Sequence, residues 1–179
     1  MNLPNKITVS RICLIPLFVV LALVHFPGSD LLSAIVFLVA AFSDFLDGYL
    51  ARSRHLVTNF GKFLDPLADK MLVCTAMIAL VAMGRLPALV PIIIICRDLL
   101  VDGLRSMAAE QGVVIAASYW GKAKTMSQII LVTLLLLESY FPESGLYHGL
   151  CIAFQIIAPA LTVWSGADYL YKGRAFLRG

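Results

Sequence analysis

Charged residues are scarce in this sequence. Only 14% of its 179 residues are charged, whereas 60% are hydrophobic and the mean hydropathy is +0.90. Since soluble domains carry about 25% charged residues, this composition excludes an ordinary soluble globular domain. An apolar stretch of about 20 residues can cross a bilayer as a helix. The length accommodates six such stretches, so we predict an all-α membrane protein with six transmembrane helices in one domain, residues 1–179. The predicted spans are 8–27, 31–53, 60–83, 87–110, 120–138 and 147–171.

Cysteine and histidine are also sparse, with four and three residues respectively. The cysteines lie singly in apolar segments, without a Cys-x-x-Cys pair or a nearby histidine. This distribution argues against a disulfide framework and against a zinc site of the usual Cys/His type. We therefore expect free cysteines, and any metal site should be built from other residue types.

Basic residues are nearly absent from one side of the predicted helix arrangement. Of the 14 lysines and arginines, only Arg85 falls in a connection on that side. Because basic connections remain in the cytoplasm, we expect the opposite side and both termini to be cytoplasmic. The net charge of +3 gives no reason to expect a nucleic-acid partner. These cations would instead attract anionic lipid headgroups and phosphorylated substrates.

The first apolar run has a second interpretation. A basic lead followed by a short apolar stretch is also the pattern of a signal peptide. No small-x-small cleavage site follows Phe26, however, and an even number of spans requires this helix. We therefore predict that it is retained as the first transmembrane helix.

Four aspartates are the exception to the scarcity of charge. Asp44, Asp47, Asp65 and Asp69 fall in predicted apolar helices, where charge is costly and usually functional. Spacings of three and four place each pair on one helix face, and a hairpin of two helices would bring the pairs together. Carboxylates this close would take up protons unless cations lay between them. All-oxygen ligands favour two hard divalent ions, Mg²⁺ first and Mn²⁺ second. The alternative is a salt network of these acids with Arg52, Arg54, Lys62 and Lys70.

The aspartates belong to a longer pattern, Asp44-x2-Asp47-Gly48-x2-Ala51-Arg52-x8-Gly61-x3-Asp65-x3-Asp69. All fixed positions match, and the stretch resembles the signature of the CDP-alcohol phosphotransferase family. The resemblance implies an enzyme that moves a phosphoalcohol from a CDP-linked donor to an acceptor hydroxyl and releases CMP. It also implies a homodimer.

The glycines and the arginine of this pattern suit a nucleotide diphosphate. Gly48 and Gly61 lack side chains, so the backbone can approach the diphosphate closely. Arg52 can donate a bidentate pair of hydrogen bonds to phosphate. The family resemblance implies that Gly48 and Arg52 contact the CDP moiety, and Thr58, near Gly61, is a further candidate.

The opening segment borders the predicted site. Asn5 and Thr8 contribute to the nucleotide site if the resemblance extends to the opening residues, and helix capping is the alternative.

Pro66 would interrupt a helix interior, because it lacks a backbone N–H. We therefore expect the third helix to begin near Phe63, with Pro66 in its first turn.

A second group of charges lies on the predicted fourth helix. Arg97, Asp98, Asp102 and Arg105 fall within an arc of about 140° at 100° per residue. Internal pairing, Asp102 with Arg105 and Asp98 with a neighbour, is one explanation. The other is a basic site for a phosphate on the acceptor. The candidate residues for this acceptor site are Arg97, Arg105, Lys122 and Lys124.

Residues 2–20 and 97–125 also resemble the bacterial phosphatidylglycerophosphate synthases, a branch of the same family. This resemblance implies transfer of the phosphatidyl group from CDP-diacylglycerol to glycerol 3-phosphate, giving phosphatidylglycerol phosphate and CMP. The acyl chains of the donor would remain among the membrane lipids. Asp69 lies at the turn of the third helix closest to an incoming acceptor, so we expect it to take the proton from the acceptor hydroxyl. Alternatives are another acceptor, namely inositol phosphate, serine or phosphatidylglycerol, and an ion transporter that uses the acids.

Overall fold

The computed structural model describes residues 3–24, 26–53, 59–110 and 119–177, and for 3–7, 44–53, 59–66, 110 and 172–177 it describes the backbone alone. Within these residues the chain forms six α-helices and one short 3-10 helix, without a strand. The helices are α1 (Leu3–Leu23), α2 (Ser29–Ser53), α3 (Asn59–Ala82), α4 (Leu89–Glu110), α5 (Tyr119–Leu137) and α6 (Gly145–Leu177), with η1 (Glu138–Tyr140) between α5 and α6. The all-α prediction is confirmed, and each α-helix overlaps one predicted span.

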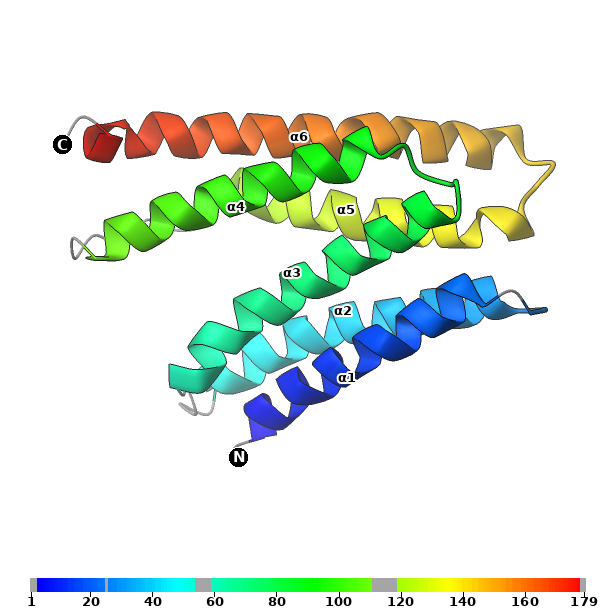
Figure 1. The fold of residues 1–179 in the computed structure, drawn as a ribbon, viewed down its shortest axis with the longest axis horizontal. Coiled ribbons are helices and arrows are strands. Elements are labelled where there is room, and N and C mark those ends of the chain that lie inside the picture. Colours follow the sequence, from blue (N-terminus) through cyan, green and yellow to red (C-terminus); the bar gives the residue numbers. More distant parts are fainter. Residues whose placement is uncertain (1–2, 25, 54–58, 111–118, 178–179) are drawn as a thin grey trace.

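Successive helices run in alternating directions, so the two termini lie at the same end of the bundle (Figure 1). This end, called the terminal end below, also holds the last turns of α2 and α4 and the first turns of α3 and α5. Residues 26–28, 83–88 and 138–144 lie at the opposite end, called the far end. α1 packs against α2 and α3, α4 and α5 pack against α6, and α5 also contacts α2 and α3. The two halves of the bundle are thus joined mainly through α5.

The core is apolar and runs through the middle of the bundle. Phe18 of α1 and Phe37 of α2 are fully buried, with ring centroids 5.9 Å apart. Met77 of α3 and Leu131 of α5 are also fully buried in the same cluster. Because these side chains interlock between helices, they determine how α1, α2, α3 and α5 lie relative to one another.

The far end is closed by a turn and an ion pair. α3 ends at a glycine in the left-handed region, Gly84, with φ of +73°. The Gly84 N–H donates to the Val81 carbonyl (3.0 Å) and the Arg85 N–H donates to the Leu80 carbonyl (2.9 Å), which is the Schellman arrangement. Arg85 Nη2 then donates to Asp30 Oδ2 of α2 at 2.7 Å. This pair ties the connection between α3 and α4 to the beginning of α2.

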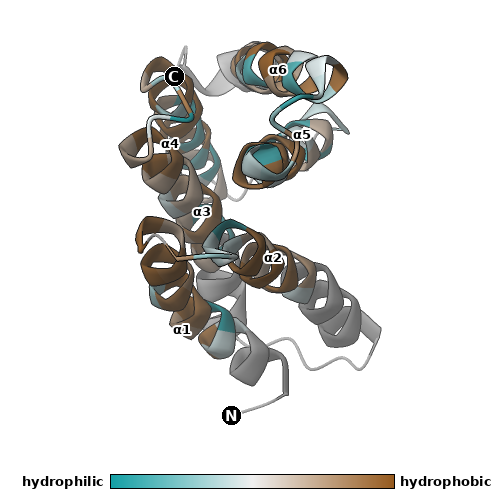
Figure 2. Cartoon of the chain, turned by 90° about the vertical axis from the view of Figure 1, so that its right-hand side faces the viewer, coloured by the Kyte–Doolittle hydropathy of each residue, from teal (hydrophilic) through white to brown (hydrophobic). Residues whose placement is uncertain are grey.

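The outward faces of the helices are strongly apolar. Large hydrophobic side chains are exposed along α4 and α6, among them Leu99 (67%), Leu100 (65%) and Ile156 (65%). Figure 2 shows apolar residues on outward faces as well as between helices. Among the described residues, one helical stretch, Gly145–Tyr171, has both the length and the apolar composition of a membrane span. Two shorter apolar stretches are Thr8–Leu23 and Ser29–Ser43.

One expected boundary is wrong. α3 begins at Asn59 rather than near Phe63, so Pro66 lies two turns inside the helix. Proline has a helical φ, but it lacks the N–H that would bond to the Lys62 carbonyl and its ring crowds that carbonyl. The helix continues through Pro66 because packing against neighbouring helices offsets this cost. Asp65 and Asp69 nevertheless lie on one continuous helix, as the spacing argument assumed.

Candidate functional site

The signature residues lie near the terminal end of α2 and α3. Asp44 and Asp47 belong to the last three turns of α2, and Asp65 belongs to the first half of α3. The two helices contact each other and run in opposite directions, which places the two acid pairs on neighbouring helices (Figure 1). The side chains of Asn5, Asp44, Asp47, Arg52 and Asp65 and the whole of Thr58 lie outside the described residues, and for Gly48 and Gly61 only the helical backbone is described. The predicted metal and donor contacts of these residues therefore stay predictions.

Asp69, the predicted base, is described and lines a small cavity. The cavity has a volume of about 50 Å³ and lies between α3, α4 and α5. Asp69 is partly exposed, whereas Asp98 and Lys124 on the other walls are buried. The polar residues that line it are Asp69, Lys70, Asp98, Lys124, Thr125 and Gln128. The fold thus brings the predicted base into one cavity with a cation predicted to hold the acceptor phosphate.

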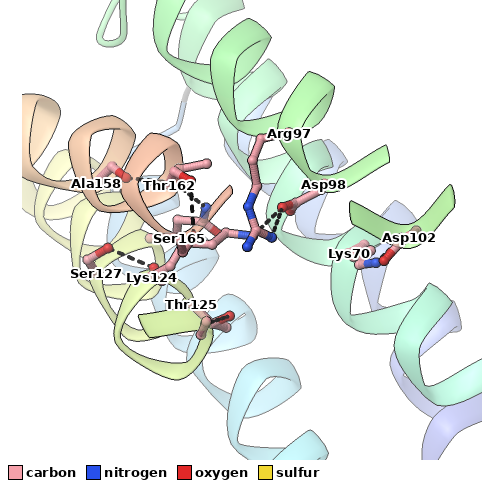
Figure 3. A network of polar contacts seen from close by, with 12 residues as sticks. Lys70, Arg97, Asp98, Asp102, Lys124, Thr125, Ser127, Ala158, Thr162 and Ser165 are labelled. Atoms are coloured by element: carbon pink, nitrogen blue, oxygen red, sulfur yellow. Dashed lines mark hydrogen bonds and ion pairs between the residues drawn. The ribbon is translucent and has the colours of Figure 1, made fainter. Parts of the chain in front are cut away.

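Asp98 holds two cations with a single oxygen (Figure 3). Arg97 Nη1 donates to Asp98 Oδ1 at 3.1 Å, and Lys124 Nζ donates to the same oxygen. All three side chains are largely buried, with exposed fractions of 13%, 10% and 7% for Arg97, Asp98 and Lys124. Within this trio the positive charges exceed the negative charges by one. Asp69 adds a further carboxylate to the cavity that Asp98 and Lys124 line.

Arg97 has hydrogen-bonding capacity to spare. Its Nε and Nη2 atoms are buried and have no hydrogen-bond partner among the described residues. A buried donor left unsatisfied costs roughly 1–3 kcal/mol, and more when the group is charged. Figure 3 shows Arg97 reaching from α4 towards α5 and α6, where its guanidinium carbon lies 5.3 Å from the centroid of the Tyr169 ring. Arg97 is therefore suited to bind a phosphate through the nitrogens that the protein leaves unused.

The other two predicted acceptor residues do not join this trio. Arg105 and Lys122 are both exposed, on α4 and at the beginning of α5. Asp102 pairs with Lys70 of α3 and not with Arg105, so this part of the internal pairing considered for α4 is wrong, whereas Asp98 does pair with its neighbour Arg97. The reason is that Asp102 faces α3, where a partner is available across the helix contact (Figure 3). Arg97 and Lys124 are thus the members of the predicted set that converge.

Three residues were missed by sequence reasoning. Arg11 of α1 was counted only among the basic residues of the chain, yet it is 1% exposed, one turn from the equally buried Thr8. The sequence offered one signal for Arg11, because it follows the candidate Thr8 by one helical turn. Gly166 and Tyr169 of α6 lie against Arg97. No sequence signal pointed to them, since residues beyond Gln128 showed only an apolar pattern.

Comparison with known proteins gives a consistent result. A family model described as CDP-alcohol phosphatidyltransferase matches residues 1–164. The chain is 44% identical to the CDP-diacylglycerol–glycerol-3-phosphate 3-phosphatidyltransferase of Bacillus subtilis, over 96% of this chain and 94% of that protein. It is 40% identical to the protein of the same name from Pseudomonas fluorescens, over 95% and 89% of the two chains. The identity to the Salmonella typhimurium protein of that name is 38%, over 98% and 97%.

Proposed function

Because the chain belongs to the CDP-alcohol phosphatidyltransferase family, we propose that it transfers the phosphatidyl group from CDP-diacylglycerol to glycerol 3-phosphate. The products are phosphatidylglycerol phosphate and CMP. Relatives of 36–44% identity that cover nearly the whole chain carry the name of this enzyme. The structural observation that supports the acceptor is the cavity shared by Asp69 and Lys124, beside the partly unsatisfied Arg97.

Asp69 is the catalytic base in this proposal. It takes the proton from the acceptor hydroxyl as that oxygen attacks the phosphorus attached to diacylglycerol. The bond from this phosphorus to the bridging oxygen breaks, and CMP leaves with the electron pair. An alcohol has a pKa far above 7, so a carboxylate within reach of its proton lowers the barrier to attack. The position of Asp69 on the cavity wall supports this role.

Arg97 and Lys124 hold the phosphate of glycerol 3-phosphate. A phosphate dianion must lose part of its hydration when it enters a buried site, and cations that are already buried offset that cost. Arg105 and Lys122, which are exposed, attract the acceptor towards the site from the surface. The donor is held by Gly48, Arg52, Thr58 and Gly61 of the signature, with Asn5 and Thr8 of the opening segment.

Divalent metal ions complete the site. The family generally depends on divalent metal, and the donor set fits, because acids of α2 and α3 supply only carboxylate oxygens. Asp44, Asp47, Asp65 and Asp69 would hold two Mg²⁺ or Mn²⁺ ions. When bound, the ions neutralise the charge of the donor diphosphate.

The chain is a single domain that crosses a bacterial cytoplasmic membrane six times, with both termini cytoplasmic. The apolar outward faces and the common end of the two termini support this topology. The described basic residues also agree, because Lys70, Arg105 and Lys122 lie towards the terminal end and Arg85 lies at the far end. The donor's acyl chains lie among membrane lipids, and two copies form a homodimer.

An acceptor competition assay tests this proposal. Purified protein is given CDP-diacylglycerol, Mg²⁺ and equal amounts of labelled glycerol 3-phosphate, inositol phosphate, serine and phosphatidylglycerol. We expect CMP release with label from glycerol 3-phosphate alone, loss of activity in EDTA, and recovery with Mg²⁺ or Mn²⁺. Preference for another acceptor would be consistent with the family assignment but would contradict transfer to glycerol 3-phosphate. Absence of CMP release with every acceptor would favour a different class of membrane protein.

A further inference from the structure

Helix α6 contains no residue of the predicted site, yet two of its residues touch Arg97. Gly166 and Tyr169 are three positions apart, so they lie on one face of α6. That face packs against α4, which carries Arg97. Gly166 lies against the stem of the Arg97 side chain, and Tyr169 lies against its guanidinium.

Gly166 leaves room for the Arg97 stem. A Cβ atom at position 166 would lie 3.0 Å from Arg97 Cγ, which is tighter than most Cβ contacts, and 3.6 Å from Nε, which is an ordinary van der Waals distance. Cγ is near the backbone, so it cannot move away without carrying the guanidinium with it. Glycine inside a helix is about 1 kcal/mol less favourable than alanine. The local cost of Gly166 is therefore offset by the position that it permits for Arg97.

Tyr169 contacts the guanidinium of the same side chain. The side chain is 6% exposed, and the guanidinium carbon of Arg97 lies 5.3 Å from its ring centroid, within the range of a cation–π contact. The ring also reaches α5, because a Cβ atom at Gly121 would lie 3.7 Å from Tyr169 Oη. Tyr169 is thus packed between α4 and α5 and has little freedom to follow Arg97.

We propose that Gly166 and Tyr169 are positioning residues that give the enzyme its preference for an acceptor with a phosphate monoester. They hold the Arg97 guanidinium so that Nη1 bonds to Asp98 while Nε and Nη2 are left for the acceptor phosphate. Pre-orienting the guanidinium removes the entropy cost of ordering a long side chain when the acceptor binds. An acceptor that lacks a phosphate gains nothing from this arrangement. The inference rests on the proposed role of Arg97 in acceptor binding.

Steady-state kinetics of Gly166→Ala and Tyr169→Leu test the proposal. We expect each variant to raise the KM for glycerol 3-phosphate at least about tenfold, while the KM for CDP-diacylglycerol stays within about twofold. Inorganic phosphate should inhibit both variants more weakly than wild type in competition with glycerol 3-phosphate. Tyr169→Phe keeps the ring and should retain most of the acceptor affinity that Tyr169→Leu loses.

Gly149→Ala is the matched control, because Gly149 lies on the same helix and a Cβ atom there meets no atom within 4 Å. It should leave both KM values unchanged. Equal rises in both KM values, or a lower kcat with an unchanged acceptor KM, would overturn the positioning role. If Gly166→Ala does not fold, Tyr169→Leu decides the question with the same readouts. Failure of wild type to use glycerol 3-phosphate is a separate result, which contradicts the proposed function itself.

Discussion

A single carboxylate oxygen organises the cations next to the candidate base. Asp98 Oδ1 accepts hydrogen bonds from both Arg97 and Lys124, and this arrangement leaves Arg97 Nε and Nη2 without partners among the described residues. Lys70 and Asp102 form a neutral pair nearby, with exposed fractions of 32% and 41%. At the scale of residues, loss of one partner should therefore lower the free energy of unfolding more in the buried trio than in the exposed pair.

Asp98→Asn removes the charge opposite two buried cations. We expect a loss of about 3–5 kcal/mol in the free energy of unfolding, as for a buried ion pair broken from one side. Asp102→Asn is the matched control, and its more exposed pair should lose about 1 kcal/mol or less. Unfolding of both variants in detergent micelles measures the difference. Equal losses would show that burial of the Asp98 trio has no energetic consequence.

Asp69→Asn tests the base. The amide keeps the size of the carboxylate but does not take a proton, so kcat should fall at least about a hundredfold. Binding of CDP-diacylglycerol should persist in part, because other signature residues also hold the donor. Single-turnover assays and donor-binding titrations separate the two effects. Turnover close to wild type across the pH range would require another base.

Arg97→Ala and Arg52→Ala should affect opposite substrates. Loss of a charged hydrogen bond costs roughly 1.5–3 kcal/mol, which is about 10- to 150-fold in affinity. We expect Arg97→Ala to raise the KM for glycerol 3-phosphate by this factor and Arg52→Ala to raise the KM for CDP-diacylglycerol. The exposed Arg105 should have a smaller, salt-sensitive effect when changed to alanine. If the two variants raise the same KM, the division into donor and acceptor sites is wrong.

At the scale of elements, the sequence contained most of the information on the helices and less on their contacts. Apolar stretches separated by short polar turns predicted every α-helix, because the number and spacing of such stretches are local properties of the chain. The predicted beginning of α3 was wrong, since helix packing can outweigh the local penalty of Pro66. The predicted partner of Asp102 was also wrong, because Lys70 comes close to Asp102 only when α3 and α4 pack together. Gly166 and Tyr169 depend on the contact of α6 with α4 and could not be found in the sequence.

Gly84 provides a test at this scale. Its φ of +73° ends α3, and a side chain in this region costs roughly 1–2 kcal/mol. Gly84→Ala should therefore lower the free energy of unfolding by about that amount. Both KM values should stay unchanged, because the turn lies at the far end of the bundle (Figure 1). A change in either KM would mean that the turn between α3 and α4 influences the distant site.

At the scale of the whole molecule, the two ends of the bundle have different roles. The terminal end carries the signature segments of α2 and α3, and the cavity with Asp69 lies further into the bundle, between the middle parts of α3, α4 and α5. At the far end, Arg85 Nη2 bonds to Asp30, and its Nη1 donates to the carbonyls of Leu135 and Leu136 at 3.4 Å. This end therefore links α2, α5 and the turn after α3 while the terminal end holds the candidate site. The proposed substrates are charged, so we expect the terminal end to face the compartment that contains them.

Site-directed labelling tests this orientation. In a variant without the four native cysteines, Glu143→Cys places a thiol at the far end and Tyr119→Cys places one at the terminal end, both at exposed positions. A membrane-impermeant maleimide should label Glu143→Cys in intact cells and Tyr119→Cys only after the membrane is opened. The physical reason is the positive-inside rule, because the described basic residues gather towards the terminal end whereas Arg85 lies at the other. Labelling of Tyr119→Cys in intact cells would place the site on the outside, where a cytoplasmic pool of glycerol 3-phosphate could not reach it.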